Sequence, residues 1–288
     1  MMRMTLIAAA LTGLFAVPAL AADAAPAAPA APAPAYTITT NVNLTSDYYF
    51  RGLTQTWHKP AIQGGADYVH TNGLYAGVWG SNVTNNSYPG GSALEFDYYG
   101  GYNGKINDDW GYTVGGHGYM YPGANNNRQA GYTAATPDQK YDSFEVNVGA
   151  SWKFVSIKYS YFLTDMFGAN YKTNPGAFGA SGNSKGSGYL ELNVAYEFVP
   201  TWTLNLHAAQ TKFKGVTVDS ADPSYKDYLV GVTKGFDGGY SVQLAYAKST
   251  YKNSPVYKPV GGLVSLANTD TITDPGEGRF ILTVGRAF

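Results

Sequence analysis

Apolar and polar residues alternate with a period of two along much of the chain. Residues 189–198 are the clearest case, with Leu190, Leu192 and Val194 on one face and Glu191, Asn193 and Glu197 on the other. The same alternation recurs at 144–153, 202–209 and 240–247. This period is that of a β-strand with two unlike faces, and a helix does not produce it. The pattern predicts an all-β protein.

Applied along the whole chain, the pattern predicts about twelve strands. They cover residues 36–50, 59–70, 73–82, 94–104, 110–121, 141–153, 154–164, 187–198, 201–213, 225–235, 239–251 and 278–288. A membrane-spanning strand needs about 9 to 11 residues, with an apolar face toward lipid and a face toward the lumen that can be polar. We therefore expect a transmembrane antiparallel up-and-down β-barrel of about twelve strands.

The predicted connections alternate between short and long links. Short links fall at 71–72, 105–109, between Lys153 and Phe154, and at 199–200 and 236–238, whereas long links fall at 51–58, 83–93, 122–140, 165–186, 214–224 and 252–277. Outer-membrane barrels have short periplasmic turns and longer outer loops, and a soluble β-sandwich has no reason to sort its loops in this way. The sorting places both termini on the periplasmic side, which requires an even number of strands.

Aromatic residues gather at both ends of the predicted strands. One group is next to short links and consists of Trp110, Trp152 and Trp202; the other is where strands meet long links and consists of Tyr48, Tyr121, Tyr161, Phe213 and Tyr251. Because Trp and Tyr favour membrane interfaces, we expect two aromatic girdles. The alternative, that these are core aromatics of a soluble protein, fits the sorting of the loops less well.

The first part of the chain resembles a secretory signal. Arg3 precedes an apolar run at 6–17, and small residues that suit a cleavage site follow it. We predict a cleaved signal peptide at 1–21, an Ala/Pro-rich linker at 22–35, and the barrel at 36–288.

Composition excludes several classes of function. The chain has no Cys, so it lacks a dithiol redox centre and a thiol nucleophile, and its net charge of −1 gives no general attraction to nucleic acid. The four His are scattered without metal-ligand spacing, and no strand-to-helix nucleophile elbow is predicted. We predict no catalytic residues, metal or cofactor, and a protein that is not an enzyme.

If the apolar faces meet lipid, the opposite faces line the lumen, and these are rich in acid. The residues expected there are Asp47, Asp67, Glu95, Asp97, Glu145, Lys158, Glu191, Glu197, His207 and Asp227. Carboxylates in a narrow passage favour cations, which predicts a weak cation preference. The alternative is that they pair across strands and fill a closed barrel. The loop at 165–186 is long enough to fold inward as a constriction, although Gly-rich loops are more often simply mobile.

The stretch 41–83 also resembles a known family. Its segments TSDYYFRG, PAIQGG and GLYAGVWGSN, together with LEFDYYGGY at 94–102 and the terminal Phe288, are similar to TorF-type porins. The resemblance spans most of the mature chain and is sharpest in its first third. It implies a Gram-negative outer-membrane barrel with porin function, and it supplies neither a substrate nor catalytic residues.

We therefore expect an outer-membrane channel for passive diffusion of small hydrophilic solutes or ions. The expected partners are outer-membrane lipid, lipopolysaccharide contacted by basic loops, and the barrel-assembly machinery, which would recognise the last strand with Phe288 as its insertion signal. Two alternatives remain: a closed surface barrel whose loops bind a partner, and an outer-membrane hydrolase.

Overall fold

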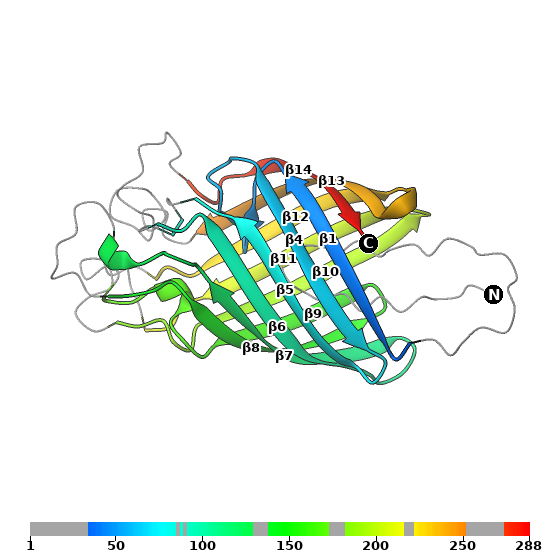
Figure 1. Cartoon of the computed structure of the whole chain (residues 1–288), viewed down its shortest axis with the longest axis horizontal. Helices are drawn as coiled ribbons and strands as arrows, with labels where there is room; N and C mark the ends of the chain where they lie inside the picture. Colours follow the sequence, from blue (N-terminus) through cyan, green and yellow to red (C-terminus); the bar gives the residue numbers. More distant parts are fainter. Residues whose placement is uncertain are drawn as a thin grey trace, which may run out of the picture.

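The computed structural model describes residues 34–84, 87–88, 91–128, 138–172, 182–215, 222–251 and 274–288. Twelve antiparallel strands, β1 and β4–β14, form one closed barrel (Figure 1). Their bounds are β1 Tyr36–Thr45, β4 Ala61–His70, β5 Leu74–Asn82, β6 Leu94–Lys105, β7 Trp110–Met120, β8 Ser143–Trp152, β9 Val155–Phe162, β10 Gly188–Val199, β11 Trp202–Lys212, β12 Tyr225–Gly235, β13 Tyr240–Tyr251 and β14 Arg279–Ala287. The predicted fold class is confirmed.

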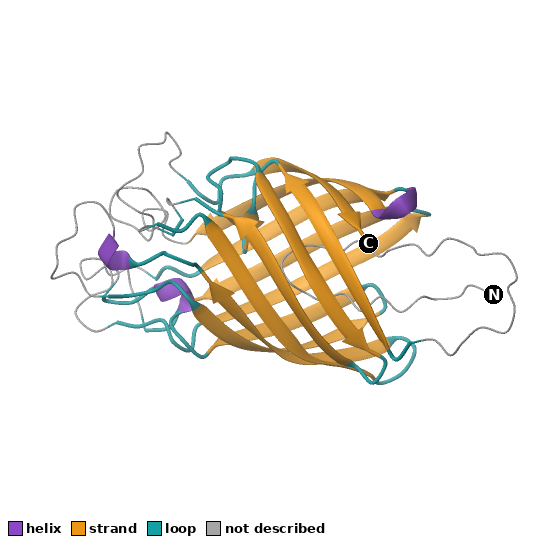
Figure 2. Cartoon of the chain, viewed as in Figure 1, coloured by secondary structure: helices purple, strands orange, loops and turns teal. Residues whose placement is uncertain are grey.

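Three short 3₁₀ turns complete the described secondary structure together with one extra hairpin. The turns are η1 (Asn126–Arg128), η2 (Met166–Gly168) and η3 (Asp237–Gly239), and the hairpin consists of β2 (Tyr49–Phe50) and β3 (Leu53–Thr54) (Figure 2). Among the described residues, no helix is long and apolar enough to cross a membrane.

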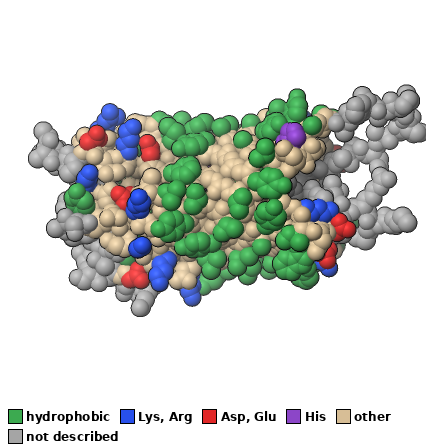
Figure 3. All heavy atoms as spheres, turned by 90° about the horizontal axis from the view of Figure 1, so that it is seen from below, with side chains coloured by type: hydrophobic (Ala, Val, Ile, Leu, Met, Phe, Trp, Pro, Cys, Tyr) green, Lys and Arg blue, Asp and Glu red, His purple; other side chains and the backbone are tan. Residues whose placement is uncertain are grey.

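The two faces of each strand differ in exposure as the alternation predicts. On β10, Leu190 and Leu192 are 45% and 47% exposed on the outside, whereas Glu191 and Asn193 between them are 7% and 8% exposed on the inside. The face drawn in Figure 3 shows a broad band free of charge, with charged side chains gathered at the two ends of the barrel. The barrel therefore has an apolar exterior and a polar interior, the arrangement that suits lipid outside.

The barrel closes where β1 meets β14. β1 pairs with β4 over its full length, but with β14 only from Asn41 to Thr45. Beyond the ladder, the Phe288 amide donates to the Thr40 carbonyl at 2.8 Å. The start of β1 and the C-terminus consequently lie at the same end of the barrel (Figure 1).

The short and long connections lie at opposite ends, as predicted. The turns after β4, β6, β8 and β10 join their strands through at most a few residues, at the end of the barrel that also holds the C-terminus (Figures 1 and 2). The longer connections, including that from β1 to β4, lie at the other end, which is called here the long-loop end.

The first predicted strand, 36–50, needs a correction. β1 ends at Thr45, and residues 46–60 do not continue the wall or form an outer loop at 51–58 as expected. They turn inward, where β2 and β3 pair through Tyr49 with Thr54 and Phe50 with Leu53. The turn between them has positive φ at Arg51 (47°) and Gly52 (76°), a conformation that glycine adopts without strain.

The residues predicted for the two aromatic girdles lie on the outer surface at one end of the barrel and partly inside it at the other. Trp110, Trp152 and Trp202 are 46%, 41% and 41% exposed beside the short turns, and Tyr161 is 37% exposed near the long-loop end. Tyr48 and Tyr121 are buried inside the barrel, because the inward segment 46–60 draws aromatic side chains to itself. Tyr251 lies on the inward alternation of β13, where its hydroxyl donates to Asp274, and Phe213 lines a groove on the outer surface.

Candidate functional site in the barrel lumen

The segment 46–60 crosses the lumen from β1 and reaches the far wall; we call it the plug. At its tip, Gly52 leaves no room for a side chain, since a Cβ there would collide with Asp227 and Ser249 on β12 and β13. The Ser249 hydroxyl donates a hydrogen bond of 2.7 Å to the Gly52 carbonyl. The glycine therefore permits both the tight turn and the close approach to the wall.

Arg51 ties the plug to the side of the barrel opposite β1. Its Nη2 lies 2.7 and 2.9 Å from the two carboxylate oxygens of Glu145 on β8. Its guanidinium also lies 4.3 Å from the centre of the Tyr189 ring and 5.2 Å from that of Phe162. Burial disfavours the charge on Arg51, but the Glu145 carboxylate outweighs this effect and raises the Arg51 pKa above its ordinary value.

The plug fills the lumen at this level. Every wall strand contributes an inward residue that is at most 6% exposed, and in ring order these are Thr45, Gln63, Ser81, Glu95, Tyr119, Glu145, Ser160, Tyr189, Thr211, Asp227, Ser249 and Ile281. Inward residues of a water-filled pore would be open to solvent all around the ring. The described residues thus close the long-loop half of the barrel.

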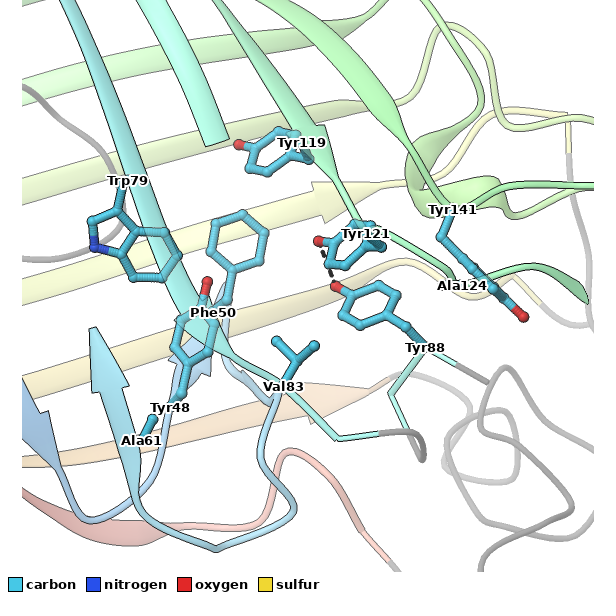
Figure 4. Packing of buried hydrophobic residues seen from close by; sticks show 10 residues of the cluster. All are labelled: Tyr48, Phe50, Ala61, Trp79, Val83, Tyr88, Tyr119, Tyr121, Ala124 and Tyr141. Carbon is cyan, nitrogen blue, oxygen red and sulfur yellow. Dashed lines mark hydrogen bonds between the residues drawn. The ribbon is translucent and has the colours of Figure 1, made fainter. Parts of the chain in front are cut away.

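An aromatic cluster packs the plug against β5 and β7 (Figure 4). Tyr48 meets the Trp79 ring edge-on at 5.4 Å, and Phe50 meets Tyr119 in the same way at 5.5 Å. Edge-to-face aromatic pairs stabilise a core beyond the area that they bury. The plug is therefore held by packing as well as by its ion pair.

The loop after β9 adds a lid above the plug. Phe167, in η2, packs edge-on against Phe50, Tyr119 and Phe162 at 5.7, 5.1 and 5.4 Å. Asp165 fixes this loop, because its carboxylate accepts hydrogen bonds from the Ser184 and Lys185 amides at 2.9 and 3.2 Å. The inward folding expected for 165–186 is thus seen at Phe167; residues 173–181 are outside the described part.

The other half of the lumen is open to solvent and forms a vestibule that faces the end with the short turns. Thr39 and Ala195, both on the inward alternation, are exposed there, and so is Glu197. Asp67 is half-buried and accepts a 2.6 Å hydrogen bond from the Tyr99 hydroxyl. In the described part of the chain, the barrel is therefore a polar cup, open at one end and closed by the plug at the other.

The predicted inward carboxylates are found inside the barrel, and most have a partner. Glu145 pairs with Arg51, Glu191 with Lys158 at 2.9 Å, Asp97 with His117 at 2.9 Å and Asp227 with His207 at 2.9 Å, while Glu95 accepts from Tyr121 at 2.8 Å. This is the pairing across strands that the second interpretation expected. Asp67 and Glu197 are the two predicted acids that lie in the vestibule.

Asp47 requires a correction, since it belongs to the plug and not to the wall. Its carboxylate accepts from the hydroxyls of Thr54 and Thr56 at 2.6 and 3.0 Å and lies 2.6 Å from His58 Nδ1. These contacts fold the plug on itself, because all four residues are within 46–60. The alternation that placed Asp47 on the wall ends at Thr45.

Sequence reasoning missed Arg51, which the structure places at the centre of the site. The residue was assigned to an exposed link because the period-two pattern stops near it. A usable signal was present: the three consecutive aromatics at 48–50 are followed by Arg51 and Gly52, which places a turn residue directly after a charge. Within the described residues, no group of three or more His, Asp or Glu side chains is placed to hold a metal ion.

Solved structures with a similar arrangement are outer-membrane porins at low sequence identity. A KdgM porin in complex with disordered oligogalacturonate has 8% identity and a TM-score of 0.48, and the match covers 87% of this chain and 98% of that one. The NanC porin has 10% identity and a TM-score of 0.48, with 88% and 99% covered. OprD of Pseudomonas aeruginosa has 12% identity and a TM-score of 0.37, with 80% and 61% covered.

No curated protein matches the chain in sequence. One family profile does match, over residues 29–286, and its description is a bacterial protein of unknown function, Gcw_chp. The profile does not bear the TorF name that the resemblance of residues 41–83 suggested. Because the match covers nearly the whole barrel and part of the preceding linker, the chain belongs to the bacterial Gcw_chp family.

Proposed function

We propose that the protein is an outer-membrane channel through which small hydrophilic solutes cross by passive diffusion. The observation that carries the proposal is the combination of an apolar exterior with a polar, water-accessible vestibule inside a closed barrel. A barrel that served only as a scaffold could be packed along its whole length, whereas a channel needs a lumen that water can enter. The resemblance to TorF-type porins supports the same function.

In this proposal the described conformation is the closed state, and the plug must move for solutes to pass. The wall strands hydrogen-bond to one another without β2 and β3, so that the plug can leave the lumen while the barrel stays closed on itself. Moving it breaks the Arg51–Glu145 ion pair and exposes the aromatic cluster. Opening is therefore a rearrangement of one loop between two fixed strands.

The proposed channel prefers cations weakly. Arg51 cancels Glu145 and Lys158 cancels Glu191, so that these four charges contribute no net field. Asp67 and Glu197 remain in the vestibule, and neither forms an ion pair with a described residue. An excess of carboxylate in a confined polar space raises the local concentration of cations.

Single-channel recording of the refolded protein tests the function. We expect conductance steps from the wild-type chain, and larger or more frequent ones when residues 48–57 are replaced by a short Gly-Ser linker. Deleting 129–137, which follow β7 and precede β8 in the sequence, is the matched control and should change the steps less. If the linker variant folds into a barrel and still conducts nothing, the channel proposal is wrong.

A closed barrel whose loops bind a partner is the second candidate, and the filled ring of buried residues favours it. Recording of the wild-type chain separates the two candidates, because a scaffold whose plug stays in place gives no conductance steps, whereas a channel gives them with the plug intact. Replacing Asp67 by Asn and Glu197 by Gln tests selectivity: the reversal potential in a salt gradient should move toward zero. An unchanged reversal potential would contradict the cation preference.

The proposed location is the outer membrane of a Gram-negative cell, reached after cleavage of the signal peptide at 1–21. β14 carries Phe280, Leu282 and Val284 on its outer face, 72%, 48% and 46% exposed, and this apolar strand with Phe288 is the proposed signal for the assembly machinery. Arg286, on the same face, lies 4.4 Å from the Phe288 ring, which keeps its charge at the rim.

A further inference from the structure

Three lysines project from the outer surface of adjacent strands at the long-loop end. Lys212 on β11, Lys226 on β12 and Lys248 on β13 are all exposed. Tyr228, on the outer face of β12, is 43% exposed, and Lys226 follows the same face two residues nearer the rim. Two residues of a strand span about 7 Å, so Lys226 lies just beyond Tyr228, near the level of lipid headgroups, and Lys248 lies directly beside Tyr228 on the next strand.

The register brings these three side chains close together. Gln210 pairs with Lys226, and Tyr228 pairs with Lys248, which makes Lys212 and Lys226 diagonal neighbours and Lys226 and Lys248 diagonal neighbours. Diagonal neighbours on one face of a sheet are about 7–8 Å apart. None of the three forms an ion pair with a described residue. Three like charges at this spacing attract an anion that fits between them.

A groove on the outer surface adjoins the lysines. It has a volume of about 320 Å³ and is lined by Tyr159, Gly186, Gly188, Leu190, Gln210, Lys212, Phe213 and Lys214. The Tyr159 ring lies over Gly188, where a Cβ would be only 2.8 Å from it, so that the glycine leaves room for the ring in the wall of the groove. Lys214 borders the same groove over Gly186. The groove is thus apolar on its membrane side and basic on its outer side.

We infer that this surface binds a phosphorylated, acylated glycolipid of the outer leaflet, the chemistry of lipopolysaccharide. Its phosphate groups lie among Lys212, Lys226 and Lys248, and an acyl chain lies along Tyr159 and Leu190. Both halves of such a lipid match the surface, whereas a soluble anion would leave the apolar half unused. The inference rests on the proposed outer-membrane location and does not depend on channel activity.

The opposite end of the barrel offers a matched control. Lys105, Lys153 and Lys234 are beside the short turns, and neutralising them changes the total charge by the same amount. Fluorescently labelled diphosphoryl lipid A, added to the full-length protein in dodecyl maltoside, reports binding through its anisotropy. Mobility on a gel before and after heating shows that each variant is a folded barrel.

We expect the variant with Lys212→Gln, Lys226→Gln and Lys248→Gln to bind lipid A at least tenfold more weakly than the wild type. The Lys105→Gln, Lys153→Gln, Lys234→Gln variant should stay within about twofold. Inorganic phosphate at millimolar concentration should not displace the lipid, and dephosphorylated lipid A should bind weakly. Equal loss in both variants, or displacement by phosphate alone, would overturn the inference. Loss of lipid binding with normal conductance, or the reverse, separates this site from the channel.

Discussion

Replacing Glu145 by Gln should open the lumen. The change keeps the size of the side chain but leaves the Arg51 charge buried without a carboxylate. Breaking a buried ion pair by removing one partner costs about 3–5 kcal/mol. Moving the plug returns Arg51 to water, so this cost falls on the closed state. Since about 1.4 kcal/mol is a factor of ten, the ratio of closed to open molecules should fall by roughly a hundredfold or more.

Open probability in planar bilayers measures this effect directly. Glu191→Gln is the matched control: it removes a buried wall carboxylate whose partner is Lys158, not the plug, and it should leave open probability near the wild-type value. The double variant Arg51→Leu, Glu145→Leu should close the lumen again, because no charge is then left buried alone. A folded Glu145→Gln protein with wild-type open probability would refute the assignment of Arg51 as the residue that holds the plug.

Phe167→Ala removes the lid's aromatic contacts with Phe50, Tyr119 and Phe162 and should raise open probability without moving the reversal potential; a change in selectivity instead would mean that Phe167 lines the path. Asp165→Ala loses two amide hydrogen bonds to a charged acceptor, each worth about 1.5–3 kcal/mol, and should produce brief openings of the same kind in bilayer recordings; stable closure would argue against its role in fixing the lid. Gly52→Ala places a Cβ against Asp227 and Ser249 and should push the tip of the plug off the wall, which raises open probability in the same recordings; wild-type open probability would show that the close approach of the tip does not hold the plug.

The wall could be predicted from the sequence because lipid and lumen impose opposite demands on alternate residues. Where both demands act, as on β10, the predicted segment 187–198 differs by only one residue at each end from Gly188–Val199. The alternation of short and long links along the chain predicted an even number of strands, because both termini must then lie at the same end of the barrel. The predicted and observed strand ends differ mainly near the long-loop end, where inward residues contact other parts of the protein instead of water.

The plug could not be predicted, because no period describes it. Tyr48 and Phe50 continue an alternation that began in β1, so that the pattern extends past Thr45, where the wall actually ends. Their partners, among them Trp79 and Tyr119, are on strands far along the chain, and contacts of this kind leave no local signature. The alternation places the carboxylates inside, but it does not show which of them has a cationic partner. For Glu145 that partner is Arg51, and the pattern does not describe where Arg51 lies.

The narrow join between β1 and β14 has a consequence for how the molecule is made. The strands paired there are separated by more than two hundred residues of sequence, so this contact is formed late and at a high cost in chain entropy. Until β14 pairs with β1, the edge strands of the growing sheet expose unpaired backbone N–H and C=O groups, to which a neighbouring chain can bind. We therefore expect a partner that covers these edges during assembly to reduce aggregation, and we expect pairing of β1 with β14 to be the slow step.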